Sequence, residues 1–137
     1  MHRLRALGRR AISAIEFALV APILLLLLLG AADFGGALQQ ATALETAARA
    51  GAQFALARPS DTAGIEGATR AALPDGWAGN SNVQATRSCF CSGTASACDA
   101  TCVNNIQVVV TVTRPYTTLL PLLPNWNLTG DATIRFR

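Results

Sequence analysis

Residues 9–33 read RRAISAIEFALVAPILLLLLLGAAD, in which a basic pair precedes an apolar run that holds a single acidic residue, Glu16. As an α-helix, residues 12–32 would extend about 31 Å, close to the hydrocarbon thickness of a bilayer, about 30 Å. An ordinary secretory signal has a shorter apolar region, of about 7–15 residues. The stretch therefore predicts a transmembrane helix.

Basic residues flank this segment unequally: Arg3, Arg5, Arg9 and Arg10 precede it, whereas Asp33 follows it. Because positive residues tend to remain in the cytoplasm, we expect a cytoplasmic N-terminus and an extracytoplasmic C-terminal part. Beyond residue 10 the 137-residue chain carries seven arginines against eight acidic residues. The exported part is thus close to neutral, which argues against nucleic acid as a partner.

Glu16 is a feature that a simple anchor does not require. A charged carboxylate costs about 2.5–3.5 kcal/mol at the centre of a membrane-spanning helix, and less near the interface. One interpretation is an interfacial acid, solvated by headgroups or paired with Arg9 or Arg10. The other is that a leader is removed nearby, so that the carboxylate pairs with the new amine of its own chain or of a neighbouring subunit.

The helical pattern continues beyond the membrane, because residues 33–56 lack proline and are rich in good helix formers. Arg58 precedes a proline and should end the helix. We therefore expect a basic leader over 1–11, a transmembrane helix extended outside the membrane over 12–57, a short helix and turn over 58–80, and a small disulfide-bonded β domain over 81–137. One apolar stripe should lie along the extended helix: Leu38, Ala41, Leu44, Ala48 and Ala52.

The C-terminal part has the alternation of short strands. Residues 106–114 alternate most clearly, with Ile106, Val108, Val110 and Val112 on one face, and shorter strands are expected over 83–86 and 132–136. Between them, residues 115–127 contain three prolines and should be irregular. A short helix over 62–73, capped by Ser60-Asp61, should bury Ile65, Ala68 and Ala72. The predicted fold class is α+β, a long helix followed by a small antiparallel sheet.

Four cysteines, Cys89, Cys91, Cys98 and Cys102, cluster in a polar stretch. Their spacing suits zinc poorly, so two disulfides are expected and no metal. A Cys89–Cys91 bond is disfavoured because one residue separates the two. The nested pairing, Cys89–Cys102 with Cys91–Cys98, is favoured since it lets the chain enter and leave the loop antiparallel. The crossed pairing, Cys89–Cys98 with Cys91–Cys102, is the alternative.

Catalytic residues do not gather in any recognisable pattern. The only histidine is His2, the exported acids are scattered through turns, and no phosphate-binding glycine loop is present. Neither an enzyme nor a cofactor is expected.

The run from Arg9 to Pro22, with the six leucines that follow, resembles the N-terminus of the TadE-like family, the minor pseudopilins of tight-adherence (Flp, type IVc) pili. Leu29-Gly30, Asp33-Phe34-Gly35 and residues 47–52 (AARAGA) extend the resemblance. It implies a minor pilin-like subunit of the inner membrane, active in initiation or assembly of such a pilus. Its partners would be a prepilin peptidase and other pilin and minor pilin subunits.

The resemblance also implies a cleavage site, because the family carries a glutamate as the fifth residue of the mature chain. Counting back from Glu16 places the cut between Ala11 and Ile12, with alanine where the family commonly has glycine. Two other functions stay open: an unprocessed, signal-anchored envelope protein that binds a partner, and a small secreted disulfide domain released after Ala32, which small residues precede.

Overall fold

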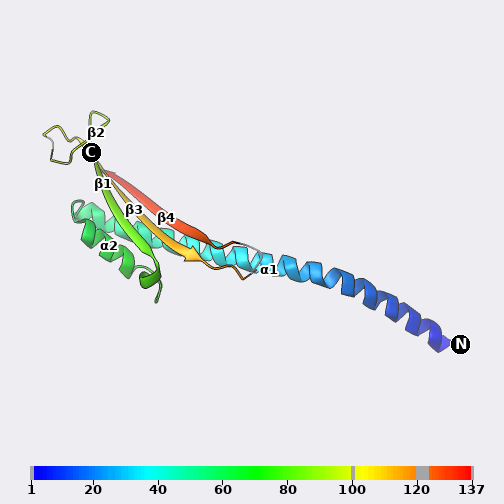
Figure 1. Ribbon diagram of the computed structural model, residues 1–137. Helices are drawn as coiled ribbons and strands as arrows, with labels where there is room; N and C mark the ends of the chain where they lie inside the picture. Colours follow the sequence, from blue (N-terminus) through cyan, green and yellow to red (C-terminus); the bar gives the residue numbers. More distant parts are fainter. Residues whose placement is uncertain (1, 100, 120–123, 137) are drawn as a thin grey trace.

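The computed structural model describes residues 2–99, 101–119 and 124–136, with side chains from Ala14 onward. Figure 1 shows a long helix whose N-terminal half extends alone and whose C-terminal half lies along a sheet. The predicted α+β class is confirmed. The elements, in order, are α1 (His2–Ala57), α2 (Thr62–Ala71), the short 3-10 turn η1 (Ala78–Asn80), β1 (Asn82–Cys91), β2 (Thr94–Ser96), β3 (Asn105–Tyr116) and β4 (Trp126–Phe136).

Helix α1 is continuous over 56 residues, and Pro22 lies inside it without interrupting it. A proline removes one backbone hydrogen bond from a helix, but neighbouring groups can tolerate this loss in a membrane segment. The helix ends one residue before Arg58, as the following proline predicts. The apolar segment that contains Glu16 and the segment that the sheet covers therefore belong to one helix.

Small side chains line the face of α1 that the sheet and α2 cover. The predicted stripe is right for Leu44, Ala48 and Ala52, but Leu38 is 60% exposed because the sheet packs on the side of Ala37. The strand β4 approaches α1 at Gly130, where a Cβ atom would collide with the backbone of α1. The core beneath the sheet consists of Leu44, Ala47, Ala48, Ala52, Ala55, Ile65, Leu73, Val83, Val108, Val110 and Val112.

The sheet has the order β2-β1-β3-β4 with every neighbouring pair antiparallel. The inner strand β3 buries Val108, Val110 and Val112 completely, which confirms the predicted inward face. Both flanking predictions were too short: β1 extends from Asn82 to Cys91, and β4 begins at Trp126.

The strands also continue into the stretch 115–127 that its prolines predicted to be irregular; residues 120–123 of it lie outside the described part. Pro115 pairs with Asn127 of β4, whereas the pairing of β3 with β1 stops at Thr113. Pro115 therefore lies where β3 has a strand on one side only, the kind of edge position at which strands tolerate proline.

Helix α2 begins as predicted, since the Asp61 side chain accepts a hydrogen bond from the Gly64 N–H at 2.8 Å. It buries Ile65 and Thr69, whereas Ala68 is only half-buried and Ala72 is exposed. The Thr69 hydroxyl donates to the Ile65 carbonyl, so this buried polar group is satisfied within the helix. The predicted face was thus displaced by one residue.

Candidate functional site at the exposed helix and its junction with the sheet

The N-terminal half of α1 presents apolar side chains to its surroundings on all sides. From Ala14 to Ala32, every residue is exposed except Ala21 and Gly30, which are half-buried. The helix is long and apolar enough to cross a membrane: a stretch of 18 residues has a mean hydropathy of 2.5, and none of it is buried. A helix that is apolar all round requires lipid or other apolar helices as its environment.

Glu16 lies exposed near the beginning of this apolar segment. The predicted cleavage residues, Ala11 and Ile12, belong to the same continuous helix, but they and the arginines before them lie outside the residues whose side chains are described. Positions 12 and 16 are four residues apart in the sequence, which is about one turn of an α-helix. The cleavage site and the role of Glu16 therefore stay predictions.

One face of α1 runs from Glu16 to the part of the helix that lies along the sheet (Figure 1). Phe34 lies 18 residues further on, about five turns at 3.6 residues per turn, and so falls on the same face. Phe34 is 72% exposed because the sheet packs against another side of the helix. We call this exposed stripe the Glu16 face; its members are Glu16, Val20, Ile23, Leu27, Phe34 and Leu38.

A buried carboxylate marks the end of the apolar segment. Asp33 is 2% exposed, and the Tyr116 hydroxyl lies 2.8 Å from both its carbonyl oxygen and its Oδ1. The Leu119 N–H donates to the same Oδ1 at 3.2 Å. We call this group, Asp33 with Tyr116 and Leu119, the Asp33 clasp. It attaches the end of β3 to α1 across 83 residues of sequence.

The surroundings of the clasp favour a neutral tyrosine. The hydrogen bond to Asp33, burial and the negative charge of Asp33 all raise the pKa of Tyr116 above its ordinary value of 10.0. The rings of Tyr116 and Trp126 stack with centroids 5.8 Å apart. Gly36 permits this approach, because a Cβ there would lie 3.0 Å from the Tyr116 hydroxyl. In the sequence, Asp33 stood out only as the residue after the apolar segment and as part of a family-like motif. No local pattern indicated its contact with Tyr116, because the two residues are far apart in the chain.

The disulfides belong to the connection between β1 and β3 that contains β2, and β2 lies at the end of the sheet away from the N-terminal half of α1 (Figure 1). They join Cys89 to Cys98 and Cys91 to Cys102, with Cα atoms 5.1 Å and 5.5 Å apart. The prediction of two disulfides is confirmed. The nested pairing, Cys89–Cys102 with Cys91–Cys98, is wrong, and the crossed alternative is the one observed.

A tight hairpin explains half of the crossed pairing. Ser92 and Gly93 both have positive φ, 50° and 86°, and turn the chain back along β1. Strand β2 then pairs Ser96 with Cys89. Cys98 follows two residues later and so arrives beside Cys89. The nested pairing was predicted for a loop without this hairpin.

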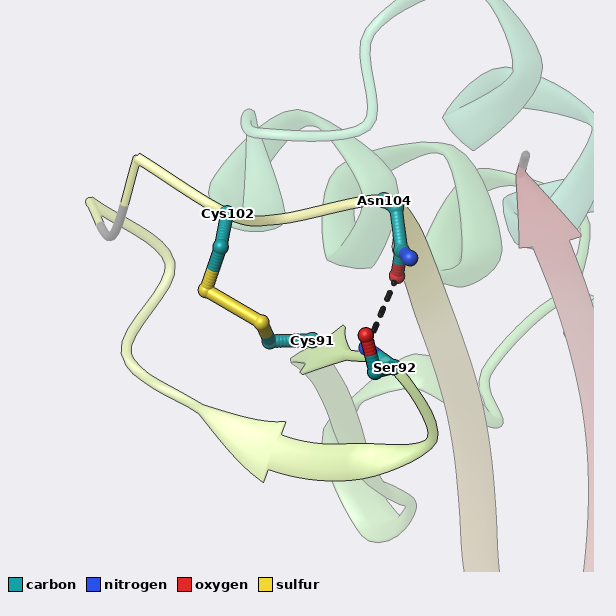
Figure 2. Close-up of a disulfide and its surroundings, with 4 residues drawn as sticks. All are labelled: Cys91, Ser92, Cys102 and Asn104. Carbon is teal, nitrogen blue, oxygen red and sulfur yellow. Dashed lines mark hydrogen bonds between the residues drawn. A yellow bond between two sulfur atoms is a disulfide. The ribbon is translucent and has the colours of Figure 1, made fainter.

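The return of the chain toward β3 explains the other half. The Asn104 N–H donates to the Phe90 carbonyl at 3.1 Å, and the Ser92 N–H donates to Asn104 Oδ1 at 3.3 Å. These bonds hold the returning segment beside the end of β1; Figure 2 shows the one between Ser92 and Asn104, together with the bond from Cys102 to Cys91. Among the described residues, no group of three or more His, Cys, Asp or Glu side chains is placed to hold a metal ion.

Comparison with known proteins assigns the N-terminal part. Residues 11–53 match the model of a family described as TadE-like protein. No curated protein and no solved structure matches the chain. The family is one of pilus components and is not known as a family of enzymes. The chain therefore carries a TadE-like segment over residues 11–53, which confirms the family that the sequence resembles and implies a protein associated with tight-adherence pili.

Proposed function

We propose that this chain is a minor pilin-like subunit (a pseudopilin) that acts in the initiation or assembly of a tight-adherence pilus. It would lie in the inner membrane as a single-pass protein, with the N-terminus in the cytoplasm and the sheet outside it. The observation that carries this proposal is the Glu16 face, an exposed apolar stripe with one carboxylate that continues beyond the membrane-length segment to Phe34 and Leu38.

Such a face suits packing against like helices. Lipid tails are as apolar as leucine, so helices associate in a membrane through close packing and polar contacts. Glu16 supplies the polar contact. Cleavage between Ala11 and Ile12 by a prepilin peptidase would create an amine about one turn away, on the same subunit or on a neighbour. Pairing of this amine with Glu16 would set the axial position of one subunit against the next.

The first test removes the charge of Glu16. Glu16→Gln keeps the size of the side chain, so we expect normal membrane insertion and loss of pilus assembly. Leu25→Ala is the control, because Leu25 is exposed and lies about half a turn round the helix from Glu16. Insertion is measured by alkaline extraction of membranes, and assembly by the amount of sheared pili. Normal pili in Glu16→Gln would contradict the proposed role of the carboxylate.

The second test concerns the cleavage site. N-terminal sequencing of the membrane-extracted protein should begin at Ile12, and Ala11→Trp should block processing while Ala11→Gly preserves it. Intact mass separates the competing functions, because an unprocessed anchor retains Met1 and a secreted domain released after Ala32 begins at Asp33. An assembling protein that starts at Met1 would refute the cleavage.

A further inference from the structure

We infer that the Asp33 clasp seats the membrane-proximal end of the sheet, at Leu119 and Trp126, in the interfacial layer of the lipid bilayer. The chain would then contact the membrane at a second place besides its spanning helix. Leu119 and Trp126 are both exposed and form the apolar patch of this contact, and lipid covers that patch. The inference rests on the proposed insertion of α1.

The clasp determines the height of the patch relative to the membrane. Asp33 directly follows the apolar residues 12–32, whose helical length of about 31 Å matches the hydrocarbon core. Asp33 thus lies where hydrocarbon gives way to headgroups. Leu119 donates its N–H to Asp33, and Trp126 stacks on Tyr116, which also bonds to Asp33. Both side chains are therefore held at the level of the interface.

The position of the Asp33 carboxylate at this level also gives a physical reason for the contact between the end of the sheet and α1. An isolated charge at the edge of the hydrocarbon is unfavourable unless polar groups surround it. The Tyr116 hydroxyl and the Leu119 N–H supply such groups to Asp33. The clasp therefore gives the carboxylate its donors and, by the same contacts, fixes the end of β3 against the membrane boundary.

The exposed apolar side chains are distributed as a membrane contact requires. Outside the segment 14–32, five large apolar side chains are exposed in the described part of the chain. Leu119 and Trp126 adjoin the clasp, Phe34 and Leu38 lie on the helix within about two turns of Asp33, and only Leu56 is distant. Tryptophan is enriched at membrane interfaces because its ring is amphipathic. Trp126 is 40% exposed, as an interfacial ring would be.

The test uses Trp126 as a depth probe in the full-length protein. Trp77→Phe leaves Trp126 as the only tryptophan and keeps an aromatic ring beneath the Arg114 guanidinium, which lies 4.0 Å from the Trp77 centroid. The protein is placed at one copy per nanodisc, with lipids brominated near the headgroup end of the acyl chains. We expect blue-shifted Trp126 emission, a severalfold loss of intensity with brominated lipid, and weak quenching by acrylamide in the water.

The matched control places the probe at the distant exposed site. Leu56→Trp, in a background with Trp77→Phe and Trp126→Phe, should be quenched by acrylamide and not by brominated lipid. Circular dichroism checks that each variant retains the fold. If Trp126 behaves like the Leu56→Trp probe while the protein stays in the disc, the inference is wrong and the proposed insertion stands.

Two other outcomes also overturn the inference. Protection of Trp126 only when several copies share a disc would show that a second copy, rather than lipid, covers the patch. Failure of the chain to remain in discs would refute insertion, and with it both this inference and the proposed function.

Discussion

Tyr116→Phe removes one hydroxyl from the Asp33 clasp and leaves the ring and its stacking on Trp126 in place. A hydroxyl has a single proton to donate, so its two 2.8 Å contacts to Asp33 represent one shared hydrogen bond. Tyr116 is 5% exposed, so water does not readily replace this donor. A hydrogen bond to a charged group contributes about 1.5–3 kcal/mol, and we expect a loss of stability of about that size.

The assay is urea unfolding of the full-length protein in detergent micelles, monitored by tryptophan fluorescence. The dependence of the unfolding free energy on urea concentration should be the same in the variant and the wild type. Asp33→Asn provides the partner for a double-mutant cycle, because its amide oxygen still accepts the hydroxyl proton without a charge. In that background Tyr116→Phe should cost only about 0.5–1.5 kcal/mol. If Tyr116→Phe alone has a free energy of unfolding within about 0.5 kcal/mol of the wild-type value, as ordinary surface changes do, the reasoning is wrong.

The same pair predicts how stability depends on pH. The folded protein raises the pKa of Tyr116 above 10.0 because the neutral hydroxyl bonds to Asp33, so the unfolded chain loses this proton first as the pH increases. The contribution is therefore complete below pH 10 and is lost as the pH rises from there through the higher folded pKa. Tyr116→Phe should lack this alkaline loss, so that its deficit narrows above pH 10. A constant deficit across that range would contradict the assignment.

Gly130→Ala should destabilise the protein by about 3 kcal/mol, near the upper end for overpacking, because the new Cβ meets backbone atoms of α1 that cannot rotate away. Gly67→Ala is its control and should stabilise α2 by about 0.5–1 kcal/mol, since nothing lies within 4 Å of a Cβ there. Urea midpoints of both variants equal to that of the wild type would contradict both expectations. Cys98→Ser should leave the Cys91–Cys102 bond intact and cost about 2–4 kcal/mol of stability, and non-reducing peptide mapping that finds Cys102 bonded to any other cysteine would refute the crossed pairing.

Local periodicity determined the parts of the fold that are regular along the chain. The apolar run around Glu16 predicts the exposed helix, because membrane length depends only on consecutive residues. The alternation of Val108, Val110 and Val112 predicts the buried face of β3, since successive side chains of a strand point to opposite sides. Asp61 predicts the start of α2 because its hydrogen bond reaches only three residues ahead.

Features that depend on which segments meet were decided by the tertiary structure alone. The turn at Ser92 brings Cys98 back to Cys89, and this reversal is invisible in the spacing of the cysteines. Asp33 and Tyr116 are 83 residues apart, so no local pattern joins them; their contact exists because β3 lies along α1 and ends at the boundary of its apolar segment. The sequence determined which residues are apolar enough for a membrane or a core, whereas packing determined which residues contact one another.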